Sequence, residues 1–156
     1  MNRPDTLSYL EVSPTAAPVS LLLKADPCET TILSYLDGAW CFAAKAEEGA
    51  IVGACVAKPI GDGVAEIFNI SVAPSFQQGG IGSRLLIFAL DALSHKRIRR
   101  VELGTGTFGH QLGYYQRHGF RVRAVVVDHF LNNYPEPIVE NGIQHKDMLR
   151  LYLDLV

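Results

Sequence analysis

Apolar residues follow two different periods along this chain, and the change of period comes near its midpoint. In the first half, residues 40–46, 50–58 and 64–72 are apolar runs, separated by glycine-containing turns at residues 47–49 and 61–63. Short turns of this kind join neighbouring antiparallel strands. The region is therefore predicted to form a three-stranded antiparallel meander.

The second half of the chain begins with a different pattern. Apolar residues recur at spacings of three and four between residues 80 and 97, which predicts a helix. The elements predicted after it are a strand at residues 100–104, a short helix at 110–118 and strands at 120–127 and 149–155. In the last strand, leucines alternate with polar residues, which predicts one buried face.

The remaining segments are less regular. The first 37 residues are predicted to hold a short strand at residues 7–12 and short helices at 19–23 and 32–36, and residues 132–137 have the composition of a loop. Strands thus come before and after each of the two later helices. This order predicts an α/β (α+β) fold with a mixed, mostly antiparallel sheet flanked by helices.

Length and charge narrow the class of protein. A chain of 156 residues predicts one domain, residues 1–156, because two halves would each bury little core. Apolar residues make up 48% of the chain and charged residues 19%, as in globular proteins and unlike disordered ones. Fourteen basic and 16 acidic side chains give a net charge of −2. This balance argues against a nucleic-acid partner and gives no reason to expect a membrane partner.

The cysteines and the apolar runs indicate a cytoplasmic protein. Cys28, Cys41 and Cys55 are too few for a disulfide framework and have no metal-binding spacing, which is typical of free thiols in a reducing compartment. No apolar run approaches the roughly 18 residues that cross a bilayer, and no signal-type stretch follows the first residues. The five histidines share no ligand spacing, so no metal is expected.

The clearest chemistry lies in the glycine-rich turn between the third strand and the long helix, Gln77-Gln78-Gly79-Gly80-Ile81-Gly82. The first N–H groups of a helix lack intrahelical partners and lie at the positive end of its dipole. Glycines let a ligand approach these groups, so the turn predicts a phosphate site made of backbone. A turn that only connects a strand to a helix has a similar composition, and this alternative stays open.

Gln77-x-x-Gly80-x-Gly82 resembles the acetyl-coenzyme A (acetyl-CoA) signature of the GNAT superfamily of N-acetyltransferases. The flanking residues resemble the family too, with Val72-Ala73-Pro74 before the signature, and Tyr115 and Gly119-Phe120 after it. The resemblance covers residues 39–130, and the tail is similar to a group of uncharacterised bacterial members. It implies a GNAT-like sheet with a splayed central strand pair, and acetyl-CoA as the donor of the acetyl group.

The resemblance also implies which residues bind acetyl-CoA. Backbone groups of Ile70 and Val72 would hold the pantetheine arm, and N–H groups from Gln78 to Ser83 would hold the pyrophosphate. Thr107 lies where many relatives have an asparagine that contacts the cofactor, so this chain departs from the family there. The expected cofactor-binding residues are Ile70, Ser71, Val72, Gln77, Gln78, Gly79, Gly80, Ile81, Gly82, Ser83, Thr107 and Tyr115.

Two residues are expected to take part in catalysis. Tyr115 matches the tyrosine that the family places near the cofactor sulfur, often the general acid. Glu66 lies eleven residues before Gln77, the separation of the glutamate base in the histone-acetylating branch, whereas other branches use another residue or an ordered water. A base is needed because an alkylammonium, with a pKa of about 10.4, cannot attack a thioester until it loses a proton. The alternatives are a solvent-facing Glu66 and a Tyr115 that only packs in the core.

The expected function is transfer of an acetyl group from acetyl-CoA to a primary amine of a small molecule or a peptide. The same scaffold could instead serve as a non-catalytic acyl-CoA sensor. Gly104-Thr105-Gly106-Thr107-Phe108-Gly109 also matches a dinucleotide-binding fingerprint, although the chain beyond it is too short for a doubly wound sheet. Asn69-Ile70-Ser71 is a formal glycosylation sequon inside a predicted strand. The sequence leaves the identity of the acceptor and a homodimer open.

Overall fold

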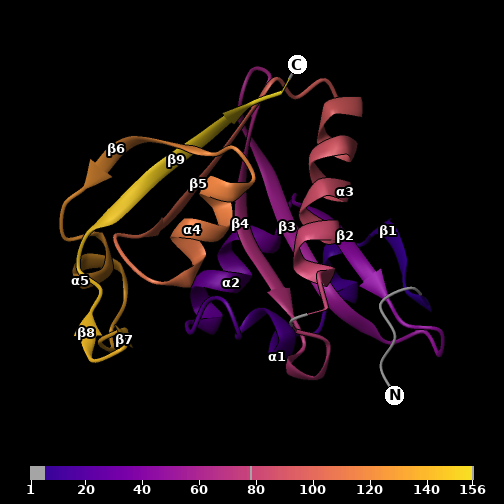
Figure 1. The fold of residues 1–156 in the computed structure, drawn as a ribbon, viewed down its shortest axis with the longest axis horizontal. Helices are drawn as coiled ribbons and strands as arrows, with labels where there is room; N and C mark the ends of the chain where they lie inside the picture. The colour runs from indigo at the N-terminus through magenta and orange to yellow at the C-terminus, as the bar shows by residue number, and fades with distance from the viewer. Residues whose placement is uncertain (1–5, 78, 156) are drawn as a thin grey trace. The chain divides into compact units, whose positions relative to one another are not determined.

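The structure, a computed structural model, describes residues 6–77 and 79–155 (Figure 1). It divides into two compact units. One unit ends at Arg99 and the other begins at Arg100. Within the described residues, none of the helices is long and apolar enough to cross a membrane. The predicted single domain and the predicted splayed strand pair both concern how the units join, and they stay predictions.

The first unit is built on a four-stranded antiparallel sheet in the order β1-β2-β3-β4. Its strands are β1 (Ser8–Val12), β2 (Trp40–Lys45), β3 (Ile51–Gly61) and β4 (Val64–Val72). Gly49 and Gly63 have φ angles of 98° and 71° at the two turns, a conformation that favours glycine. The predicted meander is confirmed, and β4 has the predicted bounds.

Helices cover both faces of this sheet. They are α1 (Val19–Leu22), α2 (Glu29–Leu36) and α3 (Ile81–His95), with short 3-10 turns at Pro14–Ala16 and Pro74–Phe76. Leu22 of α1 and Ile32 of α2 share a core cluster with Ala54 of β3. Gly53, the residue of β3 before Ala54, lies on the other face, where a Cβ built on it would be 3.3 Å from Leu85 of α3. The predicted helices are confirmed, but α1 and α3 are shorter than predicted and α2 begins three residues earlier.

The second unit is a three-stranded antiparallel sheet in the order β5-β9-β6, with α4 packed on β5. Its elements are β5 (Arg100–Gly106), α4 (His110–Arg117), β6 (Arg121–Val126), α5 (His129–Asn133), β7 (Val139–Glu140), β8 (Ile143–Gln144) and β9 (Met148–Asp154). Leu103 of β5 and Val122 of β6 both lie opposite Leu151 in the central strand. Leu103 and Leu151 are buried, whereas all six residues of β6 are exposed at the edge of the sheet.

Apart from shifts of one or two residues at the ends of β5, α4 and β6, the second unit differs from the sequence predictions in three places. Residues 132–137 are not wholly a loop, because α5 extends to Asn133, whose Nδ2 donates to the His129 carbonyl oxygen (2.8 Å). The β7–β8 hairpin lies in a stretch for which the sequence predicts no strand. The last strand begins at Met148, and Leu151 is the one fully buried residue among its leucines, so its buried face is narrower than predicted.

Candidate functional site

A sharp turn and the N-terminus of α3 form the candidate cofactor site of the first unit. A 3-10 turn at Pro74–Phe76 follows β4, Gly80 takes a left-handed conformation, and α3 begins one residue later. The Arg84 N–H donates to the Gly80 carbonyl oxygen (3.1 Å), so the N–H groups of residues 81–83 lie in the first turn of the helix, at the positive end of its dipole. Gln78, an expected pyrophosphate ligand, lies outside the described residues.

The surroundings of this turn fit a bound phosphate. The first turn of α3, which is described in full, carries no acidic residue. Gly80 has a φ of 77°, and a Cβ built on it would meet no atom within 4 Å. The backbone therefore favours glycine at this position, and the space in front of it is open. Ile81 anchors the start of the helix in the core, while Gly79, Gly82 and Ser83 are half-buried.

Gln77 braces the turn against the end of β4. Its Nε2 donates to the Val72 carbonyl oxygen at 2.9 Å. The Ala73 N–H donates to the Val52 carbonyl oxygen at 2.8 Å, which also fixes this end of β4 to β3. The Val72 carbonyl, one of the backbone groups of Ile70 and Val72 expected to hold the pantetheine arm, therefore already has a partner from its own chain. Gln77 holds the turn in place through its side chain.

Glu66, the expected base, lies in the first half of β4. It is half-buried and lies directly opposite Lys58 of β3, a cross-strand pair of opposite charges. A bulge follows it, because Val56 of β3 lies opposite Asn69 while the next residue of β3 lies opposite Ile67. The side chain is only partly covered, so the role of a base and the alternative of a solvent-facing strand residue both stay predictions.

Asn69 and Ser71 of β4 belong to a buried hydrogen-bond network that the sequence analysis missed. Ser71 Oγ donates to Asn69 Oδ1 (2.6 Å), and Asn69 Nδ2 donates to the Leu22 carbonyl and the Tyr35 hydroxyl, both at 2.9 Å. The Tyr35 hydroxyl in turn donates to Asp26 Oδ2 (3.2 Å). The network fastens β4 to the segment that carries α1 and α2, and it uses the side-chain amide that glycosylation would need. The sequence did hold a signal for this network, namely two polar residues, Asn69 and Ser71, in an otherwise apolar strand.

Tyr115, the expected acid, lies on α4 in the second unit with 6% of its surface exposed. The Tyr115 ring packs edge-on against Phe120, with centroids 5.7 Å apart. The Tyr115 backbone carbonyl accepts hydrogen bonds from the N–H groups of His118 and Phe120. The neighbouring Tyr114 is half-buried, and its ring contacts His118 at a centroid distance of 5.1 Å. Core packing of the Tyr115 ring is therefore confirmed, and this packing also fixes the direction of its phenol.

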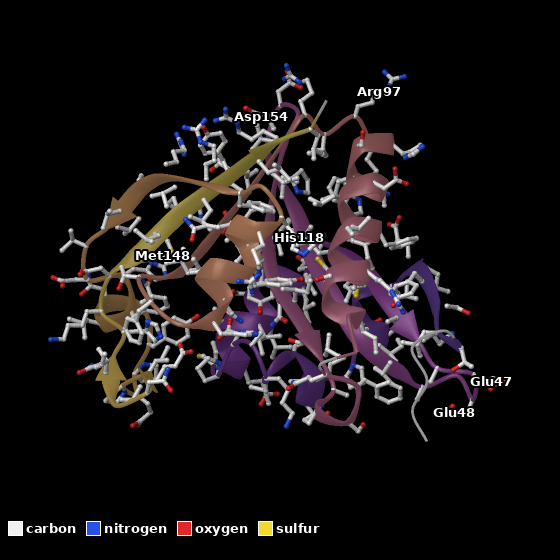
Figure 2. The ribbon with its side chains drawn as sticks, viewed as in Figure 1. Glu47, Glu48, Arg97, His118, Met148 and Asp154 are labelled. Carbon is white, nitrogen blue, oxygen red and sulfur yellow. The ribbon has the colours of Figure 1, made fainter. Side chains whose placement is uncertain are left out.

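The glycines of the Gly104–Gly109 motif make room for side chains that follow in the same unit. A Cβ on Gly104 would overlap Met148, at the start of β9 (Figure 2), and one on Gly106 would overlap the His145 ring. A Cβ on Gly109 would overlap the Glu140 carboxylate. Packing within the chain thus explains why these positions are glycines. The glycines therefore no longer indicate a loop that makes room for a dinucleotide.

A histidine and a carboxylate fasten this loop. His145 Nε2 lies 2.8 Å from Glu140 Oε1, and the His145 ring stacks on Phe108 with centroids 4.0 Å apart and planes 7° apart. His145 is 7% exposed. Thr107, the expected cofactor contact in the same loop, is exposed beside this buried stack. The contacts of His145 therefore fasten the loop on its buried side, while Thr107 stays exposed.

The three cysteines are free thiols of two kinds. Burial raises the pKa of Cys41 to about 11 and raises the pKa of the fully buried Cys55 further. Cys28 is half-buried at the N-terminus of α2, where hydrogen bonds from Thr31 lower its pKa. The prediction of free thiols is confirmed, and Cys28 has the lowest pKa and the greatest exposure of the three.

Comparison with known proteins decides the family. A model of the Acetyltransferase (GNAT) family matches residues 11–120, well over half of the chain. The chain belongs to the GNAT family. The uncharacterised N-acetyltransferase YvbK from Bacillus subtilis is 41% identical to this GNAT chain over 136 residues, 86% of this chain and 87% of that protein.

Solved structures show the same GNAT fold. A GNAT family acetyltransferase from Elizabethkingia anophelis, with acetyl-CoA bound, is 37% identical with a TM-score of 0.90, over 97% of this chain and 99% of that one. An IAA acetyltransferase from Bacillus cereus is 37% identical with a TM-score of 0.89, over 96% of this chain and 99% of that one. The predicted fold class and acyltransferase activity are confirmed. The match places the glycines at 104–109 in an acetyltransferase loop.

Proposed function

We propose that this GNAT protein moves the acetyl group of acetyl-CoA to a primary amine of a small molecule or a peptide, by direct attack of the deprotonated amine. The N-terminus of α3 carries the proposal, because it combines the family signature with the open position at Gly80 and a first turn free of acidic residues. The acetyl-CoA in the Elizabethkingia structure supports the same donor for this chain.

The residues proposed to bind acetyl-CoA run from β4 into α3. Ile70 and Val72, half-buried at the end of β4, would present backbone groups to the pantetheine arm. The N–H groups of residues 78–83 would bind the pyrophosphate at the positive end of the helix, and the exposed Arg84 adds positive charge to the same turn. Thr107 is proposed as a further contact of the cofactor.

Two side chains would move protons during the transfer. Acetyl-CoA supplies the acetyl group as a thioester, which is reactive toward a neutral amine. Glu66 would accept the proton of the ammonium, directly or through a water, because a carboxylate can act as a general base. Tyr115 would donate its phenolic proton to the departing sulfur. The fixed ring of Tyr115 supports this role, since a general acid must be held within hydrogen-bond reach.

A cytoplasmic location goes with this proposal. Free cysteines persist in reducing compartments, and this chain holds three of them. Acidic residues near its C-terminal loop, such as Glu136 and Asp147, would attract a cationic acceptor, although a solvated acidic surface has the same composition. A broad panel of amines, assayed for release of CoA, would identify the acceptor.

Acetyl-CoA should raise the melting temperature of the protein, whereas NADH at the same concentration should not. A ligand that binds only the folded state stabilises it by mass action, by about 2.7 kcal/mol at a hundredfold excess over Kd. Gly80→Asp places a negative charge in the open space before the turn, so its affinity for acetyl-CoA should fall at least about tenfold. Thermal unfolding over a range of ligand concentrations measures both effects.

Gly142→Asp is the matched control for this substitution. Gly142 has the same φ of 77°, and a Cβ built on it also meets nothing within 4 Å. The backbone strain of the two variants is therefore similar, and aspartate is among the residues that tolerate this conformation. The Gly142 variant should bind acetyl-CoA normally. Equal affinities of wild type and Gly80→Asp would remove this turn from the site.

Glu66→Gln should slow CoA release mainly at neutral pH, and high pH should restore part of the rate. The amide cannot accept a proton, but a larger fraction of the amine is already neutral at high pH. Profiles of kcat/KM between about pH 6 and pH 10 measure the effect with any responsive amine. Glu48→Gln, in the exposed β2–β3 turn, is the control and should keep the normal profile. A normal profile for Glu66→Gln would assign the base to a water or another residue.

A further inference from the structure

Four buried polar side chains form one series of hydrogen bonds in the first unit. Asn69 and Ser71 of β4 are 3% and 4% exposed, and Asp26, which precedes α2, is 6% exposed. Tyr35 of α2 links them, because its hydroxyl accepts a hydrogen bond from Asn69 Nδ2 (2.9 Å) and donates one to Asp26 Oδ2 (3.2 Å). The Ser71 hydroxyl donates to Asn69 Oδ1 (2.6 Å). These four residues are called the Asn69 network below.

The hydrogen bonds of the Asn69 network are complete. Among the described residues, the buried side-chain nitrogen and oxygen atoms without a partner are the Tyr9 hydroxyl and His145 Nδ1, and neither belongs to the network. Burying polar groups costs free energy, and apolar side chains would fill the same space without that cost. Hydrogen bonds have a direction that apolar contacts lack, so a satisfied network fixes the backbone that carries it. The Asn69 network is therefore suited to hold β4 in one defined position.

The backbone that the network holds is the segment proposed to bind the pantetheine arm of acetyl-CoA. Ile70 lies between the two network residues of β4, whose side chains are joined to each other. Asn69 Nδ2 also donates to the Leu22 carbonyl oxygen (2.9 Å), which ties the strand to α1. At the other end of the segment, Gln77 Nε2 donates to the Val72 carbonyl oxygen (2.9 Å). The segment is thus held at both ends by side chains.

We propose that Tyr35 is a positioning residue for acetyl-CoA, which acts through Asn69 to hold Ile70 in place for the pantetheine arm. This inference rests on the proposed function, because it concerns the same cofactor site. A ligand binds more tightly when its partner groups are already in position, since ordering them costs conformational freedom. Tyr35 is 6% exposed and its ring stacks on Phe68, with centroids 5.1 Å apart. Its effect on a ligand is therefore transmitted by the network and not by direct contact.

Two parts of coenzyme A should respond differently to the loss of this network. The fragment 3′-phospho-ADP keeps the adenosine and pyrophosphate groups but lacks the pantetheine arm. Its pyrophosphate is proposed to bind at the N-terminus of α3, whereas the arm is proposed to bind at the end of β4. Loss of the network should therefore weaken the binding of acetyl-CoA and spare the fragment. Loss of folded protein would weaken the binding of both ligands equally.

Calorimetric titration of the full chain with each ligand tests this difference. Tyr35→Phe removes the hydroxyl and keeps the ring that stacks on Phe68. It should raise the Kd of acetyl-CoA about three- to tenfold, the equivalent of one hydrogen bond, and leave the Kd of 3′-phospho-ADP nearly unchanged. Tyr9→Phe is the matched control, because Tyr9 is a tyrosine of β1 whose hydroxyl has no partner among the described residues. It should leave both constants normal.

Ser71→Ala tests the network from its other end and leaves α2 untouched. It removes the hydroxyl that donates to Asn69 Oδ1, so it should cause the same selective loss of acetyl-CoA affinity as Tyr35→Phe. Amide hydrogen exchange should also become faster in residues 69–72 of both variants, and not in β2, because only the end of β4 is released. Circular dichroism shows whether each variant is folded.

Equal losses for the two ligands would reduce the Asn69 network to a general structural role and overturn the inference. A normal Kd for acetyl-CoA in Tyr35→Phe would overturn it too, even if Ser71→Ala showed the loss. Both results would leave the proposed function intact, because the wild type would still bind acetyl-CoA. A wild type that binds neither acetyl-CoA nor 3′-phospho-ADP would overturn the proposed function and this inference together.

Discussion

Replacing Tyr115 with phenylalanine should lower kcat by about 10²–10⁴-fold and leave the affinity for acetyl-CoA almost unchanged. Phenylalanine keeps the ring that packs edge-on against Phe120, so the core around α4 is preserved. Only the hydroxyl is lost. Donation of its proton to the departing thiolate occurs chiefly in the transition state, so the loss should appear in kcat.

The measurement needs an acceptor for which the chemical step limits the rate. Steady-state kinetics then separate kcat from KM, and the melting temperature shows whether the variant is folded. Tyr114→Phe is the control, because Tyr114 is the adjacent tyrosine of the same helix and is only half-buried. It should keep nearly normal kcat. Normal kcat for Tyr115→Phe under these conditions would leave Tyr115 with a packing role only.

Gly106→Ala should lower the free energy of unfolding by about 1–3 kcal/mol, the usual range for overpacking a buried site. The new methyl group would overlap the ring of His145. This ring cannot move aside easily, because it stacks on Phe108 and its Nε2 lies 2.8 Å from a Glu140 carboxylate oxygen. Chemical denaturation measures the change.

Gly61→Ala is the corresponding control. Gly61 ends β3, and a Cβ built on it would meet no atom within 4 Å. Its free energy of unfolding should change by no more than about 0.5 kcal/mol. If the two variants were equally stable, the contact between Gly106 and His145 would not constrain the loop.

The sequence predicted best those elements that depend on residues close together in the chain. The bounds of β4 were correct because its apolar run lies between a glycine turn and Pro74. The start of α3 was placed within one residue, since Gly80 needs a positive φ and the apolar spacing begins directly after it. Identifying Gln77 and the glycines as a signature likewise required only adjacent residues.

Contacts between distant residues could not be predicted in the same way. Asn69 binds the Leu22 carbonyl 47 positions away, and nothing in either local pattern indicates that pairing. The glycines at 104–109 suggested a nucleotide loop, but the side chains that fill them come from residues 140–148. Glu66 and Tyr115 were chosen by resemblance, and the structure adds the burial and packing of each. Their proton-transfer roles stay predictions.

Cys28 affects how the enzyme can be assayed and labelled. Colour reagents that count the thiol of released CoA would also count Cys28, because its pKa is lowered and its side chain is partly exposed. Cys28→Ser would remove this background. The same reactivity allows one dye to be attached per chain, since Cys41 and Cys55 are buried. Such a dye would stand beside Asp26, whose carboxylate accepts the Cys28 N–H (3.1 Å), at the end of the hydrogen-bond network that leads to β4.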